Sequence, residues 1–391
     1  MNAIDMIAAE RDMKLSINST DGQGSTIGER LRSARVAAGM STRALAECIA
    51  QRVKISHATL ANYERGDTQP GIDLITAVAD ELGRPVQWFL QSGLTLRNVR
   101  YRHRKSLVTQ TACVQFEFAA QTWLDAYLHV EGKVDEPLSE ARAFDVDDVE
   151  GRTSDERARC VREMLGLKDD EPLYSVPKVM EQFGIRVVEV STDEAIDGLA
   201  ALFGSERVAV LARGLQGDRS RLNAAHEFGH VLAGDVDAEV EDKNAHTRAF
   251  EFGACLLLSP SVLKQAIGRQ SMVHLVEVKK RYGVSLASMI YRAEKLRYIT
   301  PRQAKDTWVE FAKRGWRQNE PGMVAPDRAL RFEELFERSI TLKKATFEDV
   351  SKHSGINVNE LKRRLSESIG FLDHPADKID KQTSHGLRLA R

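Results

Sequence analysis

The sequence contains only four cysteines among its 391 residues, and they are widely scattered. No two of them form a CxxC pair, which argues against a disulfide framework and against a cysteine-based zinc ribbon, and suits a reducing compartment. Long apolar runs are also missing, because no stretch approaches the roughly 18 apolar residues of a membrane helix. The first 25 residues lack the apolar core of a secretory signal. We therefore expect a soluble, cytoplasmic protein with no membrane partner.

The formal net charge of −1 hides two segments of opposite sign. Residues 26–107 hold 13 Lys and Arg against 7 Asp and Glu, a net charge of +6. Residues 131–159 hold 10 acidic against 5 basic residues, a net charge of −5. A basic module followed by an acidic stretch predicts a polyanionic partner for the first part only.

Residues 27–89 show short helical patterns separated by turn signals. Ser41 and Ser56 stand where helix N-caps are expected, and Gly66 stands where a helix should end. The spacing of apolar residues predicts five short helices in an all-helical module.

Further along, the pattern changes to a mixture of helices and strands. We expect a long helix over 110–129, an acidic linker around 145–150, and strands at 185–190 and 207–211. Helices centred on His226 and Phe252 follow, and the chain stays mostly helical to about residue 372. Residues 340–361 indicate a helical hairpin, which we expect to close the domain that contains His226.

One motif carries chemistry directly. His226 and His230 are four residues apart, so a helix places both imidazoles on one face, where they can bind one Zn²⁺. Glu227 lies beside them and can act as a general base. A chance match to HExxH should occur in roughly one or two of every hundred chains of this length. A catalytic zinc needs a third protein ligand, and the helix over 245–258 offers His246 and Glu251.

These segments resemble the ImmA/IrrE family of metallopeptidases. The resemblance rests on RSRLNAAHEFGH at 219–230 and AFEFGACLLLSP at 249–260, and on shorter landmarks that extend it over about two-thirds of the chain. It implies a zinc peptidase in which Arg219 helps to orient the substrate or the site. Its alignment puts His246 where the family has a glutamate, so we favour His246 over Glu251 as the third ligand. Residues 197–203 would be a strand bordering the cleft, where a substrate segment could add in extended form.

Residues 42–46 and 55–70 resemble the phage-repressor-like (XRE, Cro/CI-type) helix-turn-helix. The resemblance implies that Arg43 and Arg65 contact phosphates and that His57, Thr59 and Asn62 face base edges. The turn is about three residues longer than usual. An alternative is that this module binds another protein and not DNA, because many helical modules of this size do so. The basic segment 97–105 is either a further phosphate contact or a solvated linker.

We therefore predict a mostly helical α+β protein: a five-helix helix-turn-helix domain, a zincin-like peptidase domain with a small β-sheet and an active-site helix, and a helical C-terminal region. The expected boundaries follow chain order: a flexible leader at 1–25, the helix-turn-helix domain at 26–92, a helical and acidic linker at 93–156, the peptidase domain at 157–300, the helical region at 301–375 and a disordered tail at 376–391.

The expected function is a DNA-binding zinc metalloendopeptidase that cleaves a helix-turn-helix repressor, or itself, to switch transcription in a stress or mobile-element response. The alternative is a transcriptional regulator whose peptidase-like domain only senses a signal. Repressors of this type often bind double-stranded DNA as dimers, so a homodimer is an expectation from the fold.

Overall fold

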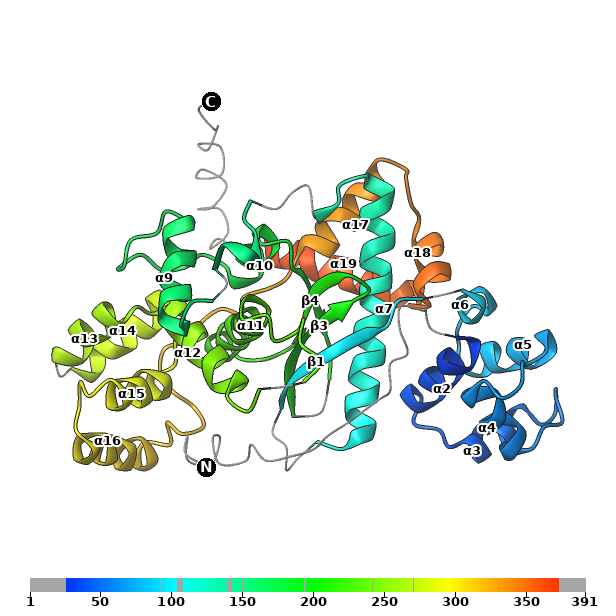
Figure 1. The fold of residues 1–391 in the computed structure, drawn as a ribbon, viewed down its shortest axis with the longest axis horizontal. Coiled ribbons are helices and arrows are strands. Elements are labelled where there is room, and N and C mark those ends of the chain that lie inside the picture. Colours follow the sequence, from blue (N-terminus) through cyan, green and yellow to red (C-terminus); the bar gives the residue numbers. More distant parts are fainter. Residues whose placement is uncertain are drawn as a thin grey trace. The chain divides into compact units, whose positions relative to one another are not determined.

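The computed structural model describes residues 26–91, 93–103, 108–138, 143–149, 151–192, 195–240, 242–269 and 271–372. Within these residues the chain is mostly helical and contains one four-stranded sheet, so the expected fold class is confirmed (Figure 1). The leader expected at 1–25 and the tail expected at 376–391 lie outside the described residues. No described helix has both the length and the apolar character that crossing a membrane requires.

The described residues form two compact units that do not follow the order of the chain. Unit 1 contains residues 94–121 and 138–329, and unit 2 contains residues 26–93, 122–137 and 330–372. The long helix α7 (Gln110–Val134) therefore contributes its first half to unit 1 and its second half to unit 2. The linear domain boundaries expected from the sequence stay predictions.

Unit 1 is built on a sheet with the strand order β1-β3-β4-β2. The strands are β1 (Leu96–His103), β2 (Arg186–Val190), β3 (Ile196–Phe203) and β4 (Glu206–Ala212). Strand β3 pairs antiparallel with both β1 and β4, whereas β4 and β2 are parallel. Strands β2, β3 and β4 are rich in buried aliphatic residues. The residue pattern indicated β2 and β4, whereas β3 was expected from the family resemblance.

Strand β1 was not expected, because its residues belong to the basic segment that was expected to be either a further phosphate contact or a solvated linker. Its charged side chains find partners on the protein instead of in water. Arg100, only 5% exposed, donates a hydrogen bond from Nη2 to the carbonyl oxygen of Ala238 over 2.5 Å. A strand of this kind lacks the apolar alternation by which strands are recognised.

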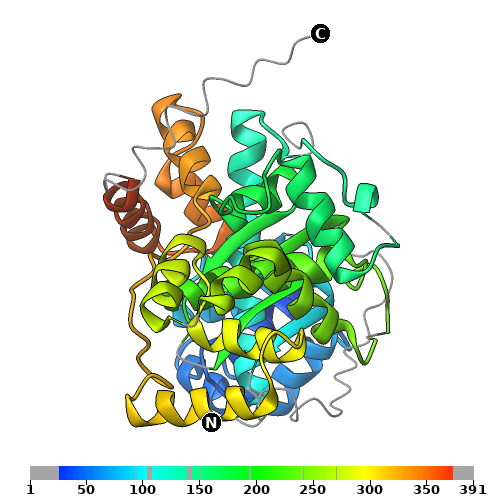
Figure 2. The ribbon, with the colours of Figure 1, turned by 90° about the vertical axis from the view of Figure 1, so that its left-hand side faces the viewer.

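Helices cover the sheet of unit 1. Helix α11 (Gly217–Leu232) packs on β3 and β4, and α12 (Ala245–Leu257) packs on α11. Figure 2 shows α11 and α12 in front of the sheet, with the yellow helices nearer to the viewer. The remaining helices of unit 1 are α9 (Ser154–Met164), α10 (Val176–Gln182), α13 (Pro260–Gly268), α14 (Met272–Tyr282), α15 (Leu286–Lys295), α16 (Pro301–Lys313) and the 3-10 helix η1 (Val146–Val149).

Unit 2 contains the five expected N-terminal helices. They are α2 (Ile27–Ala37), α3 (Thr42–Ile49), α4 (His57–Arg65), α5 (Ile72–Glu81) and α6 (Val86–Leu90). Ser41 and Ser56 accept the expected N-cap hydrogen bonds, and Gly66 ends α4 with a left-handed φ of 78°. Residues 50–56 separate α3 from α4, so the turn is longer than the usual three or four residues, as expected.

The C-terminal helices belong to the same unit. Helices α17 (Arg331–Thr341), α18 (Phe347–Ser354) and α19 (Val358–Leu372) join the second half of α7. The expected hairpin forms as α18 and α19, but its predicted place was wrong, because α18 packs on α6 of unit 2. Arg84 donates a hydrogen bond to the carbonyl oxygen of Gly355 over 3.3 Å, which ties this hairpin to the N-terminal helices.

Candidate metal centre

Helix α11 carries the two motif histidines and the glutamate on a buried stretch. His226 is 4% exposed, and Glu227 and His230 are completely buried. Their chemistry therefore depends on protein groups, because bulk water does not solvate them.

Glycines let α12 approach α11 closely. A Cβ on Gly229 would lie 2.9 Å from the Cα of Ala249, and a Cβ on Gly253 would lie 3.0 Å from the Cβ of Ala225. Larger residues at either glycine would push the helices apart. The close crossing brings the first turn of α12, and with it His246, beside the histidines of α11.

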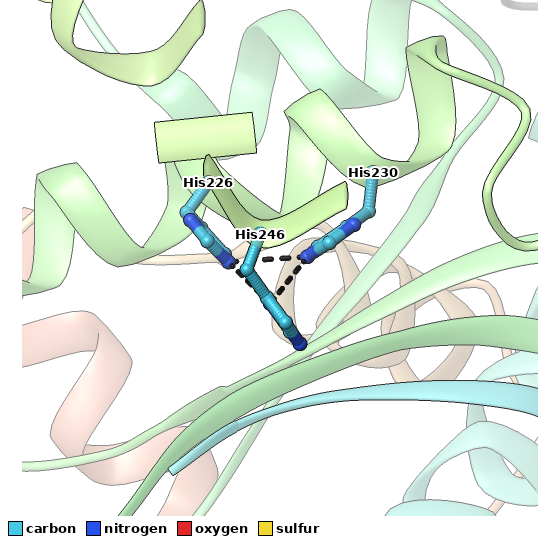
Figure 3. Close-up of side chains that lie close together, drawn as sticks. All are labelled: His226, His230 and His246. Atoms are coloured by element: carbon cyan, nitrogen blue, oxygen red, sulfur yellow. Dashed lines mark hydrogen bonds between the residues drawn. The ribbon is translucent and has the colours of Figure 1, made fainter. Parts of the chain in front are cut away.

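Three imidazole nitrogens converge between these helices, as Figure 3 shows. Nε2 of His230 lies 3.1 Å from Nε2 of His226 and 3.0 Å from Nδ1 of His246. The third side of the triangle, from His226 to His246, measures 3.3 Å. Nitrogens bonded to a tetrahedral zinc at about 2.0–2.1 Å lie about 3.3 Å apart, so this triangle fits a Zn²⁺ ion.

Asp235 holds the ring of His230 in place. Its Oδ2 accepts a hydrogen bond from Nδ1 of His230 over 2.8 Å, which leaves the lone pair of Nε2 facing the other two histidines. Asp235 is itself fixed by Arg248, whose Nη2 lies 3.2 Å from Oδ1. The sequence analysis missed Asp235, although an acidic residue just beyond a metal-binding helix is a usable signal.

The structure brings His246, and not Glu251, to the two motif histidines. Five residues along a helix turn a side chain by about 140°, so the two candidates point in different directions. Glu251 instead forms an ion pair with Lys295, and its side chain is 36% exposed.

The carboxylate of Glu227 lies against strand β3 and makes no hydrogen bond among the described residues. A Cβ on Gly198 would lie 3.5 Å from Oε1 of Glu227, an ordinary van der Waals contact, so the carboxylate lies directly against β3 at this residue. Glycine is required here by the carbonyl oxygen of Val210, which a Cβ would approach to 2.7 Å. Burial raises the pKa of Glu227 well above the usual value for glutamate; the nearby Arg102 guanidinium opposes this shift and the Asp197 carboxylate reinforces it.

Two arginines meet on Asp197 of β3. Arg219 forms a hydrogen-bonded ion pair with Oδ1 of Asp197, and Nε of Arg102 lies 3.8 Å from Oδ2. The contact that Arg219 makes at this site is with Asp197, and its role in orienting the substrate or the site stays a prediction. The sequence analysis missed Arg102 and Asp197 as site residues because it did not expect β1 beside β3.

The expectation that β3 offers a free edge to a substrate was wrong. Strand β4 pairs with one edge of β3 and strand β1 pairs with the other, from Leu96 opposite Phe203 to His103 opposite Ile196. The reason is the unexpected strand β1, which occupies the edge that the sequence analysis left open.

The residues proposed to contact DNA lie on α3 and α4 of unit 2. Arg43, His57 and Arg65 are exposed, whereas Thr59 and Asn62 are partly buried. The Thr59 hydroxyl lies 2.8 Å from Oγ of Ser56, and Asn62 accepts a hydrogen bond from Arg65.

Comparison with protein families gives two matches. Residues 31–89 match the helix-turn-helix family, and residues 180–294 match the family described as the IrrE N-terminal-like domain. The second match includes β2, β3, β4, α11 and α12, and hence the three histidines and Glu227. Neither a curated protein nor a solved structure matches the sequence.

Both matches agree with the structure. The first covers most of the helical module, with Ser41 and Ser56 as caps, and the second covers strands β2, β3 and β4 and the histidine cluster. Metallopeptidases of the second family generally bind zinc. The chain therefore joins a helix-turn-helix domain of the XRE type to a peptidase domain of the IrrE/ImmA family.

Proposed function

We propose that this chain is a zinc-dependent endopeptidase that switches transcription by cleaving a protein. The observation that carries the proposal is the triangle of imidazole nitrogens, 3.0–3.3 Å on a side, beside the buried carboxylate of Glu227. Three protein ligands would leave one position open, which is the arrangement of catalytic and not of structural zinc.

In this proposal His226, His230 and His246 hold the metal. A bound Zn²⁺ supplies a Lewis acid that polarises a carbonyl group and lowers the pKa of water towards about 7. Glu227 accepts a proton from the attacking water and passes it to the leaving amine, for which its raised pKa is suited. Asp235 keeps His230 in the required tautomer.

We further propose that the substrate is a helix-turn-helix repressor, because the DNA-binding domain would bring the peptidase to the operator on which such a repressor sits. Self-cleavage near residues 145–152 is disfavoured. Val146–Val149 forms a 3-10 helix with Val149 completely buried, whereas a peptidase binds its substrate in extended form.

We also propose the DNA contacts that the resemblance implied. Arg43 and Arg65 would contact phosphates, and the residues that face base edges would be His57, Thr59 and Asn62. The exposure of Arg43 and His57 supports this assignment. Asn62 would have to exchange its hydrogen bond with Arg65 for one with a base. We propose that two copies of the chain bind one operator as a dimer, because repressors of this type usually bind DNA in that way.

The test uses purified full-length protein with zinc, incubated with unfolded β-casein and with a candidate helix-turn-helix repressor. We expect the wild type to cleave at least one of them, and Glu227→Gln to retain zinc but to lose cleavage by about 10²–10⁴-fold. Equal cleavage by Glu227→Gln would refute the mechanism.

Two observations favour a second function. His246 replaces the glutamate of the family pattern and β1 fills the edge of β3, which would suit a regulator that senses a partner without proteolysis. A zinc-loaded wild type that cleaves neither protein, yet binds DNA in response to a ligand, would support this alternative.

A further inference from the structure

We propose that strand β1 is a resident occupant of the substrate-binding edge of β3, and that an extended, basic segment of the protein substrate takes its place. Glu227 is completely buried in this conformation and becomes accessible to the substrate when β1 leaves β3. The inference rests on the proposed peptidase function.

The first observation is the position of β3. It is the strand that lies against Glu227, at Gly198. Extended peptides bind to sheets by adding a strand to a free edge, where main-chain N–H and C=O groups are unpaired. One edge of β3 is paired with β4, and on the other Arg102 of β1 lies opposite Gly198. A substrate strand beside Glu227 would need the same main-chain groups that β1 uses.

The second observation concerns the polar side chains of β1 that face α11 and residues 236–238, which follow α11 in the chain. Alternate residues of a strand share one face. Asn98 donates a hydrogen bond to the carbonyl oxygen of Val236 over 2.9 Å, and Arg100 donates one to that of Ala238. Nε of Arg102 lies 3.8 Å from Oδ2 of Asp197, and its guanidinium interacts electrostatically with the carboxylates of Asp197 and Glu227.

These protein groups determine which kind of substrate segment can take the place of β1. The two carbonyl oxygens select hydrogen-bond donors at alternate positions. The carboxylate of Asp197, with that of Glu227 close by, favours a guanidinium or ammonium group at the next alternate position. The substrate segment is therefore extended and carries Arg or Lys two residues apart, as β1 does with Arg100 and Arg102.

The third observation is that β1 pairs irregularly. Its register shifts between Arg97 and Arg100 and again between Arg102 and His103, and Asn98 has a left-handed φ of 51°. Most of the strand is only partly buried, whereas β2 is buried throughout. A strand held by an interrupted ladder and little apolar burial separates at a lower free energy than the strands behind it.

Hydrogen exchange of the full-length wild type tests whether β1 separates. We expect the amides of β1 that donate hydrogen bonds to β3 to exchange at least about tenfold faster than the hydrogen-bonded amides of β4, because β1 opens locally while β4 needs larger unfolding. Equal protection of β1 and β4 would show that β1 is a permanent part of the sheet and would overturn the proposal.

A disulfide lock supplies the matched control. Arg97 and Leu202 lie opposite each other and are both partly buried, so Arg97→Cys with Leu202→Cys can join β1 to β3. The exposed Cys48 is changed to serine to prevent cross-linking. The remaining cysteines, Cys113, Cys160 and Cys255, are buried or partly buried, so the reduced and oxidised forms of this variant differ chiefly in the lock. Oxidation should slow exchange in β1 to the level of β4; unchanged exchange would overturn the proposal.

Cleavage of unfolded β-casein then separates this proposal from the proposed function. We expect the reduced variant to cleave at least about tenfold faster than the oxidised one. Equal rates would overturn the role of β1 while the peptidase function stands. If the wild type cleaves nothing, the proposed function fails, and the exchange experiment still decides whether β1 separates from β3.

Discussion

Nδ1 of His230 donates a hydrogen bond to Oδ2 of Asp235 over 2.8 Å, and both side chains are almost completely buried. The carboxylate fixes which ring nitrogen carries the proton. Nε2 of His230 therefore turns a lone pair towards His226 and His246, which is the state that a metal ligand needs.

Loss of this carboxylate should weaken metal binding without removing a ligand. We expect Asp235→Ala to raise the dissociation constant for Zn²⁺ by about 10–100-fold, measured by competition with a chromophoric chelator. Asp242→Ala is the matched control, because Asp242 also pairs with Arg248 but its side chain is 53% exposed. Equal affinities of the wild type and Asp235→Ala would contradict the assigned role.

A buried ion pair holds the helix-turn-helix domain together. Arg35 of α2 and Glu64 of α4 form two parallel hydrogen bonds of 2.6 Å, with side chains 10% and 6% exposed. Removing one partner leaves a buried charge unpaired, so Glu64→Ala should lower the free energy of unfolding of this unit by about 3–5 kcal/mol.

Calorimetric unfolding of the full chain measures this loss. Asp80→Ala breaks the exposed pair between Arg52 and Asp80, and it should cost less than about 1 kcal/mol. Similar losses for the two variants would mean that the buried pair contributes no more than an exposed one.

Unit 2 should lose stability in mild acid. The rings of His129 and His353 stack with centroids 4.1 Å apart. Burial, His353 and Lys133 lower the pKa of His129 to about 4, against a weaker opposing effect of Asp349, and burial lowers that of His353 as well, helped by Arg30 and Lys133.

The direction of this change in stability with pH follows from proton binding. Below about pH 6.5 the unfolded chain protonates both histidines while the folded unit does not, so stability falls as the pH drops from about 6.5 towards 4. Denaturant midpoints between pH 7 and pH 4.5 measure this effect, and His129→Phe should make the dependence shallower. An unchanged slope in that variant would contradict the account.

The features that depend on a local residue pattern could be predicted from the sequence. Ser41, Ser56 and Gly66 marked helix ends by their own hydrogen-bonding and backbone preferences. The spacing of His226 and His230 on one helix face located the candidate site. The third histidine was reached through the resemblance, and its convergence with the other two depends on the close crossing of α11 and α12 at Gly229 and Gly253.

The features that the sequence analysis missed depend on distant partners. Strand β1 is held through hydrogen bonds to carbonyl groups more than 130 residues away, from Asn98 to Val236 and from Arg100 to Ala238, and no local pattern records them. The hairpin α18–α19 was correctly expected, but its neighbour is α6, from the other end of the chain. Tertiary contacts of this kind cannot be read from periodicity.

The central claim is that three histidines form one zinc site, and the zinc content of the purified protein tests it most directly. Elemental analysis of the wild type should give about one zinc per chain, lost in His226→Ala and His246→Ala and retained in Glu251→Ala, because Glu251 pairs with Lys295 outside the cluster. A wild type that holds no zinc even after zinc is supplied, or a loss of zinc in Glu251→Ala with retention in His246→Ala, would contradict the account.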